Sequence, residues 1–250
     1  MRRVLVLLYG AIGYLVSLGA FLYAIGFVGN FGVPKAIDSG DPGRPIPSLL
    51  INAVLLGIFA LQHSGMARKG FKRWWTRFVP QPIERSTYVL FSSLALVLLY
   101  WQWRPLPEVI WKVESGGGQA VAQALFALGW LTVLLATLMI HHLDLLGMRQ
   151  VWLRFQDLPY RSLGFRTPGL YRYVRHPIQA GLLIAFWATP TMTAGHLIFA
   201  LGMTAYVVIG VKTFEERDLR KEFGPRYENY VRQVGGFLPK GRYREASPSH

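Results

Sequence analysis

The sequence predicts an all-α polytopic membrane protein. Of its 250 residues, 52% are hydrophobic and only 16% are charged, whereas ordinary soluble domains carry about 25% charged residues. Lipid leaves helices and closed barrels as the only spanning structures, because every backbone polar group must be satisfied internally. Four clear transmembrane helices are expected, then a C-terminal helical hairpin and cytoplasmic amphipathic helices, giving five to six spans. Five segments lack Lys, Arg, Asp and Glu: Val4–Val28, Ser48–His63, Ser86–Trp103, Ala120–Ile140 and Ile178–Val211.

The lengths of these segments define the expected spans, since a transmembrane helix needs roughly 20 apolar residues. The first, third and fourth segments fit, and the second is shorter and ends in Gln62-His63. The apolar run after Met1-Arg2-Arg3 is too long for a signal peptide, so a retained first span is expected. The fifth segment has 34 residues and is interrupted by Thr189-Pro190, which predicts a hairpin of two arms. If both arms cross there are six spans, and if one is shallow there are five.

The net charge of +14 is distributed by loop rather than spread over one surface. Lys and Arg number two before the first span, then two, six and two in the first three loops, six before the hairpin and nine after it. This alternation is the positive-inside pattern and places both termini on the cytoplasmic side. The membrane expected is a bacterial inner membrane. The basic loops suit an anionic lipid leaflet. Nucleic-acid binding is not expected, because the aromatic residues lie in apolar runs and at interfacial positions.

Several kinds of chemistry are excluded by residue usage. The chain has no cysteine, which rules out disulfides, thiolate metal ligands and a cysteine nucleophile. It has six histidines but not the repeated histidine boxes of membrane di-metal oxygenases, so no metal site is expected. Phosphate-loop, dinucleotide and serine-hydrolase motifs are also missing. We interpret residues 1–250 as one integral-membrane domain with a ligand-binding region at 141–239.

The polar segments around the hairpin predict three helices. The segment that starts at His141 is expected to continue the fourth span as a helix, with one apolar stripe along it. After the hairpin, Thr213–Phe223 is expected to be a helix ended by Gly224-Pro225. A second amphipathic helix should follow, because apolar residues recur there at helical spacing. The apolar stripe residues are Leu145, Met148, Trp152 and Phe155 in the first helix, and Tyr227, Tyr230, Val231 and Val234 in the last.

The Arg175-His176-Pro177 triplet stands where the hairpin enters the membrane. Pro177 holds the preceding residue away from helical geometry and suits the first position of a helix. His176 is therefore presented at the membrane entry, with Arg175 beside it. Such a cation can bind a carboxylate. The alternative is a purely structural anchor, because long polar side chains often extend to the membrane interface.

Two adjacent carboxylates, Glu215 and Glu216, follow the second arm of the hairpin. Two like charges so near a bilayer are costly unless a cation compensates them. The compensation can be internal, from nearby basic side chains, or it can come from a ligand that bears an amine, a sulfonium or a ribose diol. The internal candidates are Lys212, Arg217, Arg220 and Arg175.

Polar residues that close two of the other spans form a third group of candidates. Gln62 and His63 end the second span, and His141 and His142 end the fourth. All are expected at the cytoplasmic boundary. They can order a polar pocket, bind a substrate, or accept a proton as a general base.

Taken together, the segments LYRYVRHPIQAG and EERDLRKEFGPRYENY on either side of the hairpin resemble the isoprenylcysteine carboxyl methyltransferase and phospholipid methyltransferase superfamily. Within it, the segments FALQHSGMARKGFKRWWT and HHLDLLGMRQVW are similar to bacterial enzymes that methylate a small volatile thiol, and this likeness covers nearly the whole chain. A Phe at position 214 replaces the expected Leu. The glycine motif of phospholipid methyltransferases has no counterpart here.

The resemblance implies transfer of the methyl group of S-adenosyl-L-methionine to methanethiol, giving dimethyl sulfide at the cytoplasmic face. Under this hypothesis Gln62 and His63 contact the substrate, and Glu216→Ala abolishes cofactor binding without affecting folding. The catalytic candidates are His63, His141, His142 and Arg175. The cofactor-binding candidates are Tyr171, Tyr173, Arg175, His176, Pro177, Gly181, Glu215, Glu216 and Tyr227.

Two alternatives remain at this stage. One is a related enzyme that acts on another acceptor, such as a prenylcysteine carboxylate, a phospholipid amine or a different small thiol. The other is a non-catalytic accessory membrane protein of similar fold, for example one that serves nitrogen-oxide respiration. The Glu215-Glu216 pair and the intact Arg175-His176-Pro177 triplet argue against the second.

Overall fold

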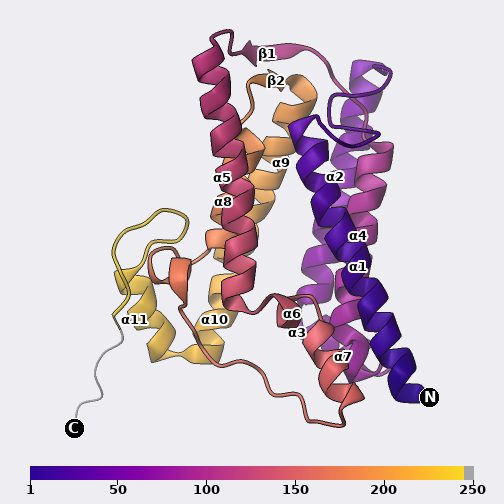
Figure 1. Ribbon diagram of the computed structural model, residues 1–250, viewed down its shortest axis with the longest axis vertical. Coiled ribbons are helices and arrows are strands. Elements are labelled where there is room, and N and C mark those ends of the chain that lie inside the picture. The colour runs from indigo at the N-terminus through magenta and orange to yellow at the C-terminus, as the bar shows by residue number, and fades with distance from the viewer. Residues whose placement is uncertain (245–250) are drawn as a thin grey trace.

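The computed structural model describes residues 1–244 and consists almost wholly of helices. Figure 1 shows a bundle of long helices with short helices gathered at the end that carries the N-terminus. In chain order the elements are α1 (Arg2–Gly29), α2 (Pro45–Ala67), α3 (Lys69–Trp75), α4 (Gln81–Gln102), β1 (Val109–Lys112), α5 (Gly116–Ile140), α6 (His142–Leu145), α7 (Met148–Phe155), η1 (Gly169–Arg172), α8 (Pro177–Trp187), β2 (Thr191–Thr193), α9 (Ala194–Ile209), η2 (Gly210–Glu215), α10 (Glu216–Phe223) and α11 (Pro225–Gln233).

Within residues 1–244, five helices are long and apolar enough to cross a membrane. Four of them are α1, α2, α4 and α5, and the fifth is the continuous stretch of α9, η2 and α10. Their outward faces carry many exposed apolar side chains, which suits contact with lipid rather than water. The predicted all-α membrane fold is therefore confirmed. On α1 these exposed side chains are Val4, Leu5, Leu8, Ile12, Leu15 and Leu22.

The two arms of the predicted hairpin differ in length. The first arm, α8, has 11 residues and is about 16 Å long, since a helix rises roughly 1.5 Å per residue. A bilayer core is about 30 Å thick, so α8 alone is too short to span it. The break expected near Thr189-Pro190 is present, because α8 ends at Trp187 and β2 follows.

A small sheet that the sequence pattern did not predict joins the hairpin to the bundle. Strand β2 pairs antiparallel with β1, with Val109 opposite Thr193 and Lys112 opposite Thr191. The two strands lie at the end of the bundle opposite the N-terminus (Figure 1). The hydroxyl of Thr193 also accepts a hydrogen bond of 3.1 Å from the backbone N–H of His196 and so caps α9.

The main hydrophobic core lies near the sheet. Phe27, Trp103 and Phe199 are almost fully buried and contact one another through edge-to-face rings 5.8–6.2 Å apart. They come from the end of α1, the residue after α4 and the first turns of α9. The bundle is thus tightly closed at the sheet end, which leaves the opposite end available for a cavity.

The expected continuation of the fourth span as one helix is wrong. His141 has a left-handed backbone conformation with φ of 104°, and Gly147 has φ of 85°. A Cβ at Gly147 would lie 2.7 Å from the backbone nitrogen of Ser86, so α4 can approach only a glycine there. These two turns split the segment into α6 and α7, and α7 packs against α1 and α4.

The last two predicted helices are present, and the first of them ends where predicted but begins at Glu216, after η2, rather than at Thr213. Helix α10 ends at Phe223, Gly224 has φ of 52°, and Pro225 begins α11. Glycine suits this positive φ, and proline suits the first position of the next helix. Tyr227 and Tyr230 form the buried face of α11.

Candidate functional site

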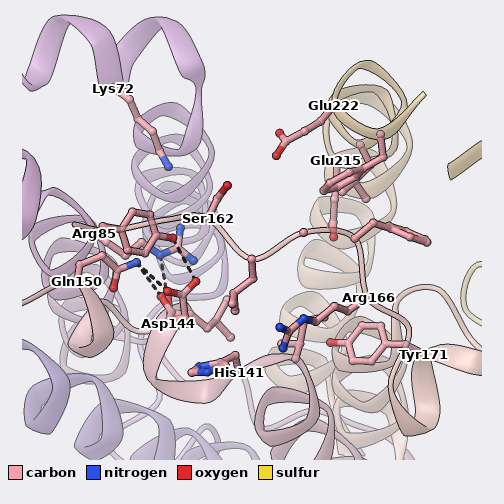
Figure 2. A pocket seen from close by; sticks show the side chains of 18 of the residues that line it. Lys72, Arg85, His141, Asp144, Gln150, Ser162, Arg166, Tyr171, Glu215 and Glu222 are labelled. Carbon is pink, nitrogen blue, oxygen red and sulfur yellow. Dashed lines mark hydrogen bonds between the residues drawn. The ribbon is translucent and has the colours of Figure 1, made fainter. Parts of the chain in front are cut away.

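A cavity of about 960 Å³ opens at the end of the bundle that carries α3, α6 and α10. Lys72 and Arg85 of α3 and α4 line one side, and Glu215 and Glu222 line the other (Figure 2). Residues 156–168, which we call the strap, run across the cavity between α7 and η1. The volume lies within the range typical of small-molecule sites.

Arg175 and Glu216 form an ion pair beside the cavity. The Nη2 atom of Arg175 lies 2.5 Å from Oε1 of Glu216, and its Nε atom lies 3.1 Å from the same oxygen. The other carboxylate oxygen lies 3.5 Å from Nη2 of Arg220. Both partners of the main pair are mostly buried, with exposed fractions of 11% and 15%. The negative charge of Glu216 is therefore compensated within the protein. Two of the four predicted basic residues, Arg175 and Arg220, provide this compensation.

The segment that follows α11 is held against this pair. The backbone N–H groups of Arg175 and His176 donate to the carbonyls of Gly235 and Gly236, at 2.9 and 3.0 Å. The guanidinium of Arg175 also donates to the carbonyl of Val234. Arg175 thereby connects the start of α8, the start of α10 and the end of α11.

His176 is almost fully buried between the two carboxylates. Its Nε2 atom lies 3.2 Å from Glu216, and its Nδ1 atom lies 3.4 Å from Glu215. Burial alone would lower the pKa of His176, but the hydrogen bonds and charges of Glu215 and Glu216 outweigh it and raise the pKa above its ordinary value. His176 therefore joins Arg175 in a cluster of mixed charge with Glu215 and Glu216.

Glu215 differs from Glu216 in that it faces the cavity. Its side chain is 43% exposed, and it lines the cavity whereas Glu216 does not. One oxygen accepts a 3.0 Å hydrogen bond from Nε2 of Gln179. Burial and the charge of Glu215 raise the pKa of Tyr171, another lining residue. Glu215 is thus the carboxylate of the pair that a ligand can reach.

An aromatic cluster supports the strap at its η1 end. Phe165 packs edge-on or tilted against Phe223, Tyr227 and Tyr230, with ring centroids 5.4–6.1 Å apart. All four side chains line the cavity. Tyr227 was a sequence candidate. The pattern analysis missed Phe165 and Tyr230 as site residues, although the helical spacing of Tyr227 and Tyr230 already indicated that they share a face.

The three candidate histidines occupy different environments. His141 lines the cavity. The ring nitrogens of His142 lie 3.2 Å from the hydroxyls of Tyr14 in α1 and of Thr137 in α5. His63 lies between α2 and α4, bonded to Tyr88 at 2.9 Å and to Ser92 at 3.1 Å. Of these three histidines, only His141 lines the cavity.

Four other candidates lie outside the lining of the cavity. Gly181 is in the contact between α5 and α8, where a Cβ would lie 2.6 Å from the carbonyl oxygen of Gly129. Gly181 does not line the cavity. Its lack of a side chain allows α5 and α8 to approach each other closely. Pro177 begins α8, Tyr173 is exposed beside Arg242, and Gln62 donates to the sulfur of Met66.

The charges around the cavity are mixed in sign. Its basic residues come from α3, α4, α7, the strap and Arg175, which lies two residues before α8. Its carboxylates are Glu84 of α4 and Asp144 of α6, near Lys72 and Arg85, and Glu215 of η2 and Glu222 of α10. Figure 2 shows Glu215 and Glu222 on the side opposite Lys72 and Arg85. This arrangement suits a ligand that carries both charges. The sequence motifs indicated the acidic side, but the basic side is assembled from distant loops.

Most of the chain matches one known protein family. The model of the NnrU protein family matches residues 49–237, which include both walls of the cavity. The chain belongs to the NnrU family. No solved structure matches the chain.

Curated relatives of this NnrU-family chain extend over nearly its whole length. A protein of Mycobacterium tuberculosis named methanethiol S-methyltransferase is 55% identical over 96% of this chain and 98% of its own. Proteins named methanethiol S-methyltransferase from Crocosphaera subtropica and methanethiol S-methyltransferase 2 from Bradyrhizobium diazoefficiens are 51% and 50% identical, over 96% and 95% of this chain and 93% and 91% of theirs. The predicted resemblance to membrane thiol methyltransferases is thus confirmed, and a methyltransferase requires a methyl donor.

Proposed function

We propose that this protein transfers a methyl group from S-adenosyl-L-methionine to methanethiol and releases dimethyl sulfide. The observation that carries the proposal is the 50–55% identity to three bacterial proteins named methanethiol S-methyltransferase, each over at least 95% of this chain. The cavity between α3, α4, α8 and α10 is the proposed reaction site.

The residues around the cavity fit this methyl donor, which has cationic amine and sulfonium groups, a carboxylate and an aromatic base. Glu215 offers a partly exposed carboxylate to a cation. Phe165 and Phe223 offer apolar aromatic faces, and the basic residues of the lining offer partners for a carboxylate. We assign Arg175, His176 and Glu216 to the support of Glu215 and of the cavity wall, because they bond mainly to one another.

When bound, the donor supplies a methyl carbon on a sulfonium, and the thiol sulfur forms a bond to that carbon while the sulfonium C–S bond breaks. The products are dimethyl sulfide, S-adenosylhomocysteine and one proton. The protein's task is mainly to align the two sulfur atoms and to stabilise charge. Glu215 holds the cationic end of the donor, and the aromatic wall excludes water from it.

His141 is the best placed of the three histidines to accept the thiol proton. A thiolate is a far better nucleophile than a thiol, and small thiols are mostly protonated near neutral pH, as the cysteine pKa of about 8.5 indicates. His141 lines the cavity, whereas His63 and His142 bond to hydroxyls elsewhere in the bundle. We assign His141 as the general base and His63 to the packing of α2 against α4.

The proposed orientation puts the cavity in the cytoplasm. The basic loops before α4 and before α8 lie at the cavity end of the bundle, and such loops stay on the cytoplasmic side. The methyl donor is made in that compartment. The thiol is small and apolar enough to arrive through the lipid, so no wide substrate groove is required.

The test is a headspace assay with purified protein in lipid nanodiscs. Methyl-labelled S-adenosylmethionine and methanethiol should give labelled dimethyl sulfide, and Glu215→Gln should reduce the rate at least tenfold. A matched control is Glu114→Gln, which removes a carboxylate near the sheet end. Label that appears in lipid or in a prenylcysteine ester instead would overturn the assignment of the acceptor, and no transfer to any acceptor would overturn the activity.

A further inference from the structure

We propose that Arg166, in the strap, binds the carboxylate of the methyl donor and so determines how the donor lies in the cavity. This inference rests on the proposed function, because it assumes a zwitterionic donor. The segments LYRYVRHPIQAG and EERDLRKEFGPRYENY do not include Arg166.

The argument starts from the basic residues that line the cavity. Four of the five are already engaged within the protein: Lys72 lies 4.0 Å from Glu84, Arg85 donates to the carbonyl of Leu145 at 2.8 Å, Arg154 lies 3.4 Å from Asp157, and Arg175 is paired with Glu216. In the part of the chain that the structure describes, the Arg166 side chain has no hydrogen bond or ion pair. A new anion can therefore bind Arg166 without breaking an existing interaction.

The position of Arg166 is determined by its neighbour. Phe165 is held in the aromatic cluster with Phe223 and Tyr230. At its other end the strap is tied to α6 and α7, because Tyr160 donates to Asp144 at 3.3 Å and Arg149 donates to the carbonyl of Arg161 at 3.1 Å. The strap is therefore anchored on both sides of the cavity, which fixes the position of the Arg166 backbone relative to the cavity.

The direction of Arg166 fits the proposed role. Arg166, Tyr171 and Glu215 all line the cavity, and Figure 2 shows the three on the side opposite Lys72 and Arg85. Burial and the negative charge of Glu215 both raise the pKa of Tyr171. A cation and a carboxylate thus face one cavity region from the strap and from η2. An amino acid moiety, which carries an amine and a carboxylate on one carbon, needs this pair of partners.

The test compares the natural donor with decarboxylated S-adenosylmethionine, which keeps the amine and the sulfonium. Binding of both to the full-length protein in nanodiscs is measured by calorimetry, without methanethiol. Arg166→Gln should weaken S-adenosylmethionine binding by about 10- to 100-fold, the usual contribution of a charge-assisted hydrogen bond. The same variant should bind the decarboxylated donor within twofold of the unsubstituted protein.

The matched control is Arg161→Gln, which removes an equal charge from the same strap at a residue that does not line the cavity. It should bind both donors normally. Equal losses for both donors in Arg166→Gln would show that Arg166 only holds the strap, and no loss would show that it does not touch the donor, so either outcome overturns the inference. Failure of the unsubstituted protein to bind S-adenosylmethionine would overturn the proposed function as well.

Discussion

Arg175 and Glu216 lie 41 positions apart in the chain and form an ion pair whose closest atoms are 2.5 Å apart. The pair joins Arg175, two residues before the short helix α8, to the first residue of α10. Because Arg175 also binds the end of α11, one guanidinium connects three segments of the cavity wall. The two polar motifs on either side of the hairpin are thus joined to each other directly.

This pairing changes the expected effect of removing each glutamate. Glu216→Gln should lower the unfolding midpoint by several degrees, because loss of one partner of a mostly buried pair costs about 3 kcal/mol. Glu215→Gln should leave the midpoint nearly unchanged and weaken donor binding at least tenfold. Thermal unfolding and calorimetric binding on the two variants check this. The reverse pattern would return the ligand-binding role to Glu216, as the sequence alone had suggested.

Stability should depend on pH through His176. Its pKa is raised in the folded protein by the hydrogen bonds that it donates to Glu215 and Glu216, which outweigh its burial, so the folded state binds the proton more tightly than the unfolded state does. This contribution is fully present below the ordinary histidine pKa of about 6.5 and is lost as pH rises through the higher folded value. The unfolding midpoint should therefore fall as pH rises above about 6.5, and His176→Gln should flatten that dependence. An equal slope in both proteins would contradict the assignment.

The contact between α5 and α8 should not tolerate a side chain at Gly181. A Cβ there would lie 2.6 Å from the carbonyl oxygen of Gly129 and 3.0 Å from the backbone nitrogen of Val133, and backbone atoms cannot move aside cheaply. Gly181→Ala should destabilise the protein by about 1–3 kcal/mol, seen as a lower unfolding midpoint. Gly57→Ala is the control, because nothing lies within 4 Å of a Cβ at that position. Equal midpoints for the two variants would argue against the close approach of these helices.

The choice of His141 as the general base can be tested without disturbing the turn after α5. His141 has φ of 104°, and asparagine is among the residues that adopt positive φ most readily. His141→Asn should reduce kcat by about 100-fold, a usual contribution of a general base. His142→Asn, the adjacent substitution, should change kcat by less than threefold, since His142 faces Tyr14 and Thr137. A decrease in kcat that is seen only in His142→Asn would assign the general-base role to His142 instead.

Much of the fold follows from local sequence patterns. The charge-free segments predicted the long helices, Thr189-Pro190 predicted the break in the hairpin, and Gly224-Pro225 predicted the end of α10. Each of these three features depends on chain composition or on backbone stereochemistry at a single position. None of them requires knowledge of distant contacts. The split of the helix after His141 was missed because it depends on how closely α4 approaches Gly147.

The same division applies to the site. The chain's residue pattern shows that two polar motifs flank an apolar hairpin, and its resemblance to membrane methyltransferases indicates the kind of reaction. The folded structure was needed to show that Glu216 is paired with Arg175, that Glu215 faces the cavity, and that Arg166 lines it from the strap. This is because the partners of a charged side chain come from whatever segments the fold brings beside it. Here Arg175 and Glu216 lie 41 positions apart in the chain, and Gln179 and Glu215 lie 36 apart, beyond the reach of any local pattern.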